Sequence, residues 1–483
     1  MKMTKLMSVV GVLALAVACS SSEEEPAADV TGASLAQSVS ADAVVGHLQQ
    51  LSDIAAAHDG NRAAGTAGYD ASVDYVSNAL KEAGFDVETP EFEFDSFDVT
   101  TQTLRFGDRD LVVNALSYSP ATPAGGITAR VVGAPADDTP GCEATDYDGL
   151  DVTGAVVVVT RGVCPFAQKQ QIATDRGAVA VLVANNEDGP LDSATLGSKE
   201  DAKIPTGGIS RDDGAALLAA PSQVTLVIDS TTTTTTSRNV IAQTKTGSTE
   251  NIVMAGAHLD SVPEGPGIND NGTGTASVLE SALQLGSEPQ VTNAVRFAFW
   301  GAEELGLVGS TKYVESLDDA GKKAIALYMN FDMVGSNNAG YLVYDGDDSD
   351  KVGSPAGPTG SDAIERVFSG QLLLEGEAPD GTDFDGRSDY GPFIEVGIPA
   401  GGVFTGADEE KTEAQAAKWG GEAGKTFDPN YHTVDDTLAN VDRDALAVNA
   451  KAVAYGIGNY AQSIEGPNGV PAFADRDSVR APK

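Results

Sequence analysis

Apolar residues recur at helical spacing near the start of the chain. This spacing predicts a helix over 41–57 and a second over 72–83, with Gly84 following the second helix. The apolar positions that carry the two predictions are Val44, Val45, Leu48, Leu51 and Ala55, then Val73, Val76 and Leu80.

Between about 100 and 230 the pattern changes to short apolar runs of strand type, separated by glycine, proline and aspartate turns. These runs lie at 127–132, 155–160, 178–184 and 224–228. The six consecutive threonines at 231–236 are interpreted as a low-complexity joint.

After this joint, strand and helix patterns alternate. Such alternation predicts an α/β fold with an open, mostly parallel sheet and helices on both faces. The predicted strands lie at 240–244, 252–257, 295–300 and 324–331, and the predicted helices at 273–285 and 307–317. The β-rich section is then an insertion that splits the α/β domain. We expect the α/β domain at 39–99 and 233–466, the insert at 100–232, and a loosely held polar tail at 467–483.

The first residues have the pattern of an export signal. Lys2 and Lys5 precede an apolar stretch that is too short to span a bilayer, which predicts a signal peptide over 1–18. The residues before Cys19 resemble a bacterial lipobox, which predicts a lipidated Cys19, a tether over 19–38 and a lipid anchor in the cell envelope. Ala16-Val17-Ala18 also fits ordinary secretory cleavage, so secretion without an anchor is the alternative.

Composition narrows the possible partners. The 483 residues carry a net charge of −41, and a field of this sign repels a phosphate backbone, which argues against a nucleic-acid partner. Three cysteines are present, and lipidation would use Cys19. In an oxidising compartment, the remaining Cys142 and Cys164 suggest one disulfide, with two buried thiols as the alternative.

Three predicted strands end in side chains that bind metals. His258 follows one strand, Glu303 and Glu304 follow the next, and Asp332 ends the third. The carboxyl ends of such strands share one edge of the sheet, so we expect these side chains together. Asp260 is close enough in sequence to hold the other imidazole nitrogen of His258. Histidines with several carboxylates suit zinc, and so many carboxylates predict two ions that share one of them.

Seven motifs follow one another in this half: HLDS (258–261), GINDNGTG (267–274), WGAEELGL (300–307), NFDMVG (330–335), DGRSDYGPF (385–393), GVFTGA (402–407) and YHTVDD (431–436). In this order they resemble the bacterial secreted di-zinc leucine aminopeptidases, whose wider family includes glutamate carboxypeptidases and the transferrin receptor ectodomain. The insert resembles a protease-associated domain through GVCPF (162–166), Lys169, RGA (176–178) and NN (185–186). The resemblance implies a zinc exopeptidase fold interrupted by this insert.

The resemblance also implies roles for individual residues. Asp270 would bridge two zinc ions, with His258 and Asp332 on one ion and Glu304 and His432 on the other. Glu303 would act as general base on a water molecule that bridges the metals, and Tyr431 would donate to the oxyanion. The substrate pocket would include Met333, Phe404, Gly386 and Arg387.

The implied reaction is removal of a large apolar, Leu-like residue from a peptide with a free N-terminus. Carboxylates such as Glu303 and Asp332 suit the α-ammonium group, whereas a carboxypeptidase would need basic residues, and Arg387 alone stands out near the motifs. A carboxypeptidase of the same family is therefore the alternative, and a non-enzymatic receptor on this fold is a third. The family's disulfide beside the final histidine is absent here, where Asn430 stands, so the ranking of Leu, Met and Phe stays open.

Overall fold

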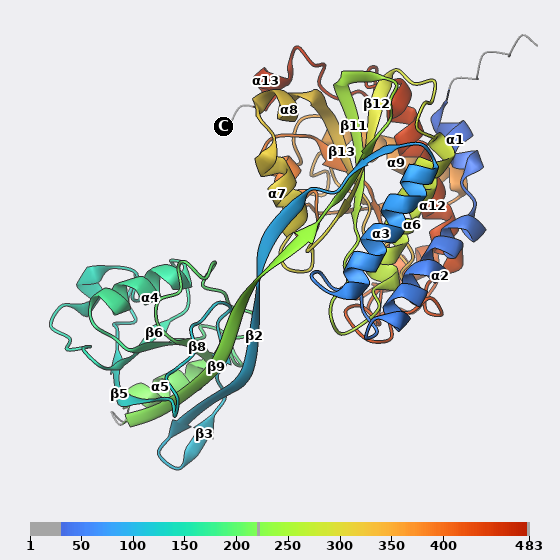
Figure 1. The fold of residues 1–483 in the computed structure, drawn as a ribbon. Coiled ribbons are helices and arrows are strands. Elements are labelled where there is room, and N and C mark those ends of the chain that lie inside the picture. The colour runs from blue at the N-terminus through green and yellow to red at the C-terminus, as the bar shows by residue number, and fades with distance from the viewer. Residues whose placement is uncertain (1–29, 220–222, 481–483) are drawn as a thin grey trace, which may run out of the picture.

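A computed structural model describes residues 30–219 and 223–480, which form two domains joined by two long strands (Figure 1). The expected signal peptide over 1–18, Cys19 and the first part of the tether lie outside the described residues. Among the helices that are described, none combines the length and the apolar character needed to cross a membrane.

The larger domain is built on a six-stranded sheet, which confirms the predicted α/β architecture. Its strands, in order across the sheet, are β1 (Asp86–Glu88), β10 (Val240–Gln243), β12 (Asn293–Trp300), β11 (Ser248–His258), β13 (Ile325–Asn330) and β16 (Ala400–Gly401). β11 runs parallel to β12 and β13, and β13 runs parallel to β16, whereas β1 and β10 form an antiparallel edge. A small second sheet consists of β15 (Asp380–Thr382), β14 (Leu342–Tyr344) and β17 (Val403–Phe404).

Helices cover both faces of the large sheet because its central strands are apolar on both sides. In β12, Phe297 and Phe299 pack toward one face, and Ala298 and Trp300 pack toward the other. The first face is covered by α1 (Gly32–Ser38), α2 (Ala41–Ala57), α3 (Ala67–Glu82), α6 (Gly274–Leu285), α9 (Ser361–Glu375) and α12 (Arg443–Gln462). The second face is covered by α7 (Val308–Ser316) and α10 (Gly391–Glu395). Two further helices are α8 (Asp319–Ala324) and α11 (Glu413–Trp419).

Two N-terminal segments differ from their predicted limits. Helix α1 lies within the expected tether, and its Leu35 and Ala36 are buried against the core, so this stretch belongs to the folded domain. Helix α3 begins at Ala67, five residues before the predicted start, because the Thr66 side chain accepts a hydrogen bond from the backbone N–H of Tyr69 and caps the helix there.

The inserted domain has its own eight-stranded sheet. Its strands, in order, are β3 (Arg109–Leu111), β2 (Glu91–Phe106), β9 (Gln223–Arg238), β5 (Ile127–Gly133), β6 (Val156–Thr160), β7 (Ala180–Ala184), β8 (Thr206–Ile209) and β4 (Asn114–Ala115). Strands β5 to β8 are parallel neighbours, and α4 (Phe166–Asp175) and α5 (Arg211–Ala219) accompany them. The predicted disulfide is confirmed, since Cys142 and Cys164 are joined by an S–S bond with Cα atoms 5.9 Å apart.

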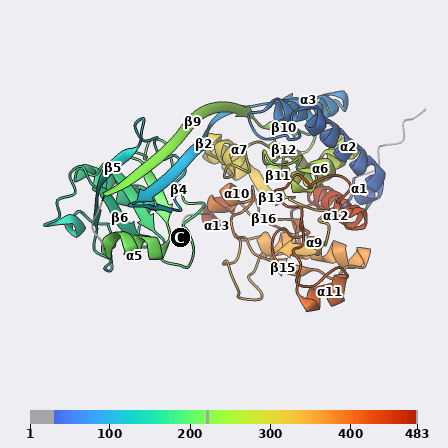
Figure 2. The ribbon, with the colours of Figure 1, turned by 90° about the horizontal axis from the view of Figure 1, so that it is seen from below.

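Strands β2 and β9 form the connection between the domains (Figure 2). The six threonines at 231–236 lie within β9 and pair with β2, so the expected joint is an extended strand. β-Branched threonine favours this conformation. The expected domain boundaries after residues 99 and 232 both fall inside these two strands.

The C-terminal segment contradicts the expectation of a loosely held tail. Arg476, at the start of α13 (Arg476–Val479), is fully buried, and its guanidinium donates to the backbone carbonyls of Glu250 at 2.7 Å and Lys323 at 2.8 Å. Arg480 donates to the carbonyl of Ile325 at 2.8 Å. Guanidinium groups hold the end of this segment against the start of β11 and β13, and Val470 packs into the core of the larger domain.

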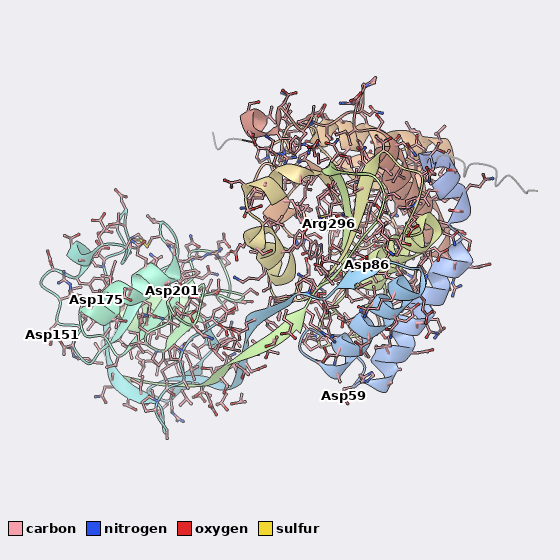
Figure 3. The ribbon with its side chains drawn as sticks, turned by 45° about the horizontal axis from the view of Figure 1, so that its top comes forward. Asp59, Asp86, Asp151, Asp175, Asp201 and Arg296 are labelled. Carbon is pink, nitrogen blue, oxygen red and sulfur yellow. A yellow bond between two sulfur atoms is a disulfide. The ribbon has the colours of Figure 1, made fainter. Side chains whose placement is uncertain are left out.

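The acidic excess is distributed over the surfaces of both domains. Figure 3 shows Asp59 on the larger domain and Asp151, Asp175 and Asp201 on the insert, and all four residues are exposed. A different group of carboxylates, described next, is buried.

Candidate active site

The predicted metal-binding residues converge at the carboxyl edge of the large sheet. His258 ends β11 and is 1% exposed. Its Nε2 atom lies 3.1 Å from Asp270 Oδ1 and 3.3 Å from Asp332 Oδ1. Glu303 is close as well, with Oε2 at 3.9 Å from the same nitrogen.

Asp270 lies between the two histidines. It belongs to the turn η2 (Ile268–Thr273), and while its Oδ1 faces His258, its Oδ2 lies 3.1 Å from His432 Nε2. His432 also contacts Glu304, whose Oε2 is 2.9 Å away. The five residues expected to bind metal therefore form one continuous cluster around the Asp270 carboxylate.

Asp260 contacts this cluster through His258 and through the backbone of the two glutamates. Its Oδ1 lies 3.7 Å from His258 Nδ1, on the side of the imidazole facing away from Asp270. The same carboxylate accepts hydrogen bonds from the backbone N–H groups of Glu303 at 3.2 Å and Glu304 at 3.4 Å. Asp260 thus connects the end of β11 with the loop that follows β12.

The cluster is a buried excess of negative charge. Burial raises the pKa of Glu303 well above its usual range and that of Glu304 to about 8. Burial opposes protonation of the histidines, but the carboxylates outweigh it and raise the pKa of His258 strongly and that of His432 to about 10. Conversely, although burial alone would raise it, contact with both imidazoles lowers the pKa of Asp270.

Two buried oxygens of the cluster have no hydrogen-bond partner among the described residues: Glu304 Oε1 and Asp332 Oδ1. An unpaired buried oxygen costs about 1–3 kcal/mol. Ligand atoms of His258, Glu303 and Asp332 lie within 4.8 Å of one another, as do those of His258, Asp270 and Glu304. Imidazole nitrogens and free carboxylate oxygens at this spacing fit divalent metal ions such as zinc.

Three supporting residues were not predicted. The Asp436 carboxylate accepts the backbone N–H groups of Asn269 at 2.7 Å and Asp270 at 3.0 Å, and burial raises its pKa to about 7. The Ser388 hydroxyl donates to Asp332 Oδ2 at 2.6 Å. The fully buried Arg62 donates to the carbonyls of Leu259 and Gly267. Ser388 and Asp436 lie inside the motifs DGRSDYGPF (385–393) and YHTVDD (431–436), but no feature of these motifs distinguishes the two residues from their neighbours.

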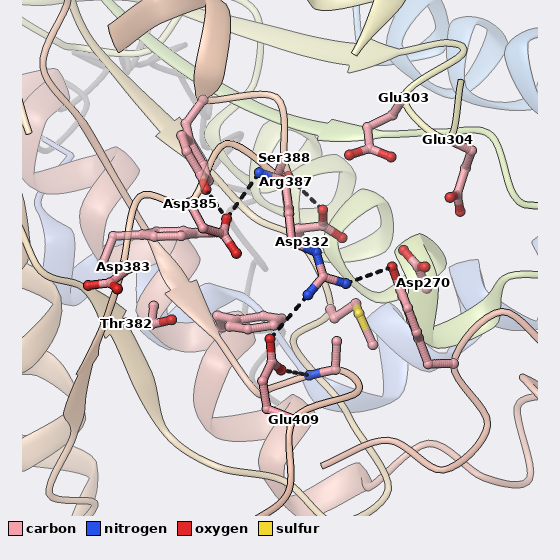
Figure 4. Close-up of a pocket in the computed structure, with 16 residues that line it drawn as sticks. Asp270, Glu303, Glu304, Asp332, Thr382, Asp383, Asp385, Arg387, Ser388 and Glu409 are labelled. Carbon is pink, nitrogen blue, oxygen red and sulfur yellow. Dashed lines mark hydrogen bonds and ion pairs between the residues drawn. The ribbon is translucent and has the colours of Figure 1, made fainter. Parts of the chain in front are cut away.

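A cleft opens beside the cluster (Figure 4). Of the residues expected in the substrate pocket, Met333, Phe404 and Arg387 line it, as does Tyr431. Gly386 is not among the lining residues, and its backbone N–H donates to the Tyr390 hydroxyl at 2.9 Å. The Tyr431 ring stacks on His432 with ring centroids 3.8 Å apart.

Arg387 is already engaged by two carboxylates. Its guanidinium contacts Asp408 at 3.0 Å and Glu409 at 3.2 Å. One further nitrogen–oxygen distance, 3.5 Å, joins it to the Tyr431 hydroxyl. The positive charge of Arg387 is therefore compensated within the protein.

The chain resembles known proteins over nearly all of its length. Residues 239–457 match the model of peptidase family M28, and residues 127–217 match that of the PA domain. The probable lipoprotein aminopeptidase LpqL of Mycobacterium tuberculosis is 54% identical over 93% of this chain and 91% of its own length. An aminopeptidase of Pseudomonas aeruginosa is 44% identical over 85% of this chain and 79% of its own.

Solved structures agree with these matches. An aminopeptidase from an Aneurinibacillus species superposes with a TM-score of 0.71 at 28% identity, covering 92% of this chain and 98% of its own. BSAP, a zinc aminopeptidase from Bacillus subtilis, superposes with a TM-score of 0.62 at 28% identity, covering 89% and 98%.

Proposed function

Because the chain belongs to peptidase family M28, we propose that it is a zinc aminopeptidase that removes single residues from the free N-terminus of peptides. The observation that carries this proposal is the position of Asp270 between two imidazoles, each 3.1 Å from one of its oxygens. One carboxylate that faces two histidines in this way can be shared by two metal ions. LpqL is named a probable lipoprotein aminopeptidase, the Pseudomonas aeruginosa relative is named an aminopeptidase, and BSAP is a zinc aminopeptidase.

We assign the ligands to two zinc ions. Asp270 would be shared, His258 and Asp332 would complete one site, and Glu304 and His432 would complete the other. The contacts of His258 with Asp332 at 3.3 Å and of His432 with Glu304 at 2.9 Å support this division. Glu304 Oε1 and Asp332 Oδ1, which accept no hydrogen bond within the described chain, would then each gain a metal ion as a partner.

Two zinc ions, when bound, would lower the pKa of a shared water molecule and polarise the scissile carbonyl. Glu303 is 8% exposed, lines the cleft and has a raised pKa, so its carboxylate is suited to accept the proton of the attacking water and pass it to the leaving amine. The Tyr431 hydroxyl, also in the cleft, would donate to the oxyanion.

The charge of the cleft favours an aminopeptidase over a carboxypeptidase. The carboxylates of Glu303 and Asp332 would receive the α-ammonium group of a substrate. A terminal carboxylate would need a free cation, but Arg387 is paired with Asp408 and Glu409. A purely binding function on this fold is disfavoured because the five proposed ligands and Glu303 are all present at the site.

The cleft also supports a preference for a large apolar first residue. Met333 and Phe404 line it, and burial of a Leu side chain contributes about 1.5–3 kcal/mol, roughly ten- to a hundredfold in selectivity. We therefore propose that Leu-like residues are good substrates.

The test is hydrolysis of leucyl p-nitroanilide by purified enzyme, compared with its N-acetyl form. We expect turnover of the free amine only, loss of activity with a chelator, and elemental analysis that returns two zinc ions per chain. Comparable turnover of the acetylated substrate, or release of residues from the C-terminus of peptides, would overturn the proposal. If elemental analysis finds at most one metal ion per chain, the proposal that Asp270 is shared by two zinc ions is wrong.

We further propose that the protein is exported and anchored through a lipid on Cys19. The relative LpqL is named a probable lipoprotein, which supports the lipobox interpretation. Wild-type protein should fractionate with membranes, and Cys19→Ser should release it or alter its location. Mass spectrometry that finds an unmodified N-terminus in the culture medium would instead favour simple secretion.

A further inference from the structure

The cleft continues beyond the proposed metal ligands to a second group of carboxylates. Asp383, Asp385 and Glu409 line it there, and Arg387 is the lone cation among its lining residues within the described chain. Figure 4 shows Asp383 on the opposite side of the cleft from Glu303 and Glu304. An acidic wall thus faces the cluster across the cleft.

The charge of this wall is only partly compensated. Glu409 is paired with Arg387 at 3.2 Å, whereas neither Asp383 nor Asp385 forms an ion pair with any residue that the structure describes. Both carboxylates are nevertheless held in place. Asp385 Oδ1 accepts from the Tyr390 hydroxyl at 2.7 Å and from a backbone N–H, and Asp383 Oδ2 accepts from the backbone N–H of Ser354 at 3.1 Å.

Apolar side chains line the same cleft. Met333, Phe404 and Tyr344 contribute to it along with the acidic wall. A lysine or arginine side chain has the matching chemistry, with an aliphatic stem and a cationic end. A leucine side chain would use the apolar part of the cleft alone.

From this arrangement we infer that the cleft also accepts N-terminal Lys and Arg, and that Asp383 is the specificity-determining residue that receives their charged ends. Asp383 suits this role better than Asp385, because Asp383 accepts one hydrogen bond where Asp385 accepts two. Asp383 is also partly buried, whereas Asp385 is exposed, so water and salt screen the charge of Asp383 less. The inference rests on the proposed aminopeptidase function and names a substrate class for that same site.

The experiment compares p-nitroanilides of lysine and norleucine, which share a stem and differ in the terminal ammonium. In the wild type at low salt we expect kcat/KM for lysine to exceed that for norleucine by about three- to tenfold, the scale of a partly exposed charge pair, and to fall with added salt. Asp383→Asn should bring the ratio close to one, chiefly by lowering kcat/KM for lysine. Asp383→Glu should retain part of the preference.

Glu395→Gln is the matched control, because it removes one exposed carboxylate at the end of α10, outside the cleft lining. It should keep the wild-type ratio. A wild-type ratio at or below one, or a ratio that Asp383→Asn leaves unchanged, would overturn the inference. Norleucine turnover reports whether each variant is folded. If neither leucine nor lysine substrates are hydrolysed by the wild type, the proposed function itself fails, which is a distinguishable result.

Discussion

In both domains, polar side chains follow the ends of parallel strands, but the hydrogen bonding of these side chains differs between the domains. In the insert, Asn185 follows β7, and its Oδ1 accepts from Arg161 at 3.1 Å and from the N–H of Asn186 at 3.0 Å. In the larger domain, the residues after β12 and β13 include Glu304 and Asp332, and each has a buried oxygen that accepts no hydrogen bond within the described chain. A satisfied carboxamide stabilises a turn, whereas an unpaired buried carboxylate oxygen indicates the edge that binds a ligand.

The largest expected effect is on kcat, and it should appear at the sheet edge of the larger domain and not at that of the insert. Glu303→Gln should retain both zinc ions and lose at least about 100-fold in kcat, the scale of general-base catalysis. Asn185→Ala at the insert's edge should leave kcat unchanged. Turnover of leucyl p-nitroanilide and elemental analysis measure both outcomes. Glu304→Gln should lose or weaken one zinc ion. Equal metal loss in both variants would show that the roles of the two glutamates are assigned wrongly.

The disulfide tests whether the insert is stable independently of the catalytic domain. Replacing both Cys142 and Cys164 with Ala opens a loop of sequence separation 22, which should cost the insert about 3 kcal/mol in free energy of unfolding. Denaturant unfolding should show this loss. Zinc content should be unchanged, because the proposed metal ligands lie in the other domain. A loss of zinc would indicate that the two domains are coupled.

Asp436 tests how strongly the surroundings of the metal cluster matter. The two carboxylate oxygens of Asp436 accept the backbone N–H groups of Asn269 and Asp270, and Asp436→Asn replaces one of these oxygens with an amide group. We therefore expect zinc affinity to fall by about 10- to 100-fold. Competition with a chelator measures the affinity. Asp435→Asn, which alters the exposed neighbouring carboxylate, is the control and should behave as wild type. Equal losses in both variants would show a nonspecific charge effect.

The last test is the pH dependence of zinc binding. The neighbouring carboxylates raise the pKa of His258 and raise that of His432 to about 10, so a proton competes with zinc, which binds neutral imidazole. Zinc uptake should therefore release protons, and affinity should increase about tenfold per pH unit for each proton released, until the pH passes the His432 pKa of about 10. Titration calorimetry in buffers of different ionisation enthalpy counts these protons, and equal heats would contradict the expectation.

The strands that carry the site were predictable because their side chains are apolar on both faces. The limits predicted for β12 and β13 lie within two residues of those observed, and the positions of His258, Glu303 and Asp332 follow from them. The histidine-to-carboxylate convergence was predictable for the same reason, since parallel strands share a carboxyl edge.

The supporting contacts could not be predicted in the same way. The Asp436 carboxylate accepts a hydrogen bond from the backbone of Asn269, which lies 167 residues earlier in the sequence. In a chain with 71 acidic residues, no pattern distinguishes this aspartate from an exposed one. Arg476 was missed for a related reason, because a polar segment that is anchored through carbonyl groups lacks the apolar periodicity by which buried helices are recognised.

The ribbon of β2 and β9 has a topological consequence. The chain leaves the catalytic domain and returns to it on paired neighbours, with Phe92 opposite Ser237 and Asp95 opposite Thr234. To the catalytic domain, the whole insert is equivalent to the tip of a single β-hairpin. A two-residue Asn-Gly turn that joins Asp95 to Thr234 would close the chain without moving either end. Such an excision would retain Phe92 and Phe94, which pack against Ala302 beside Glu303.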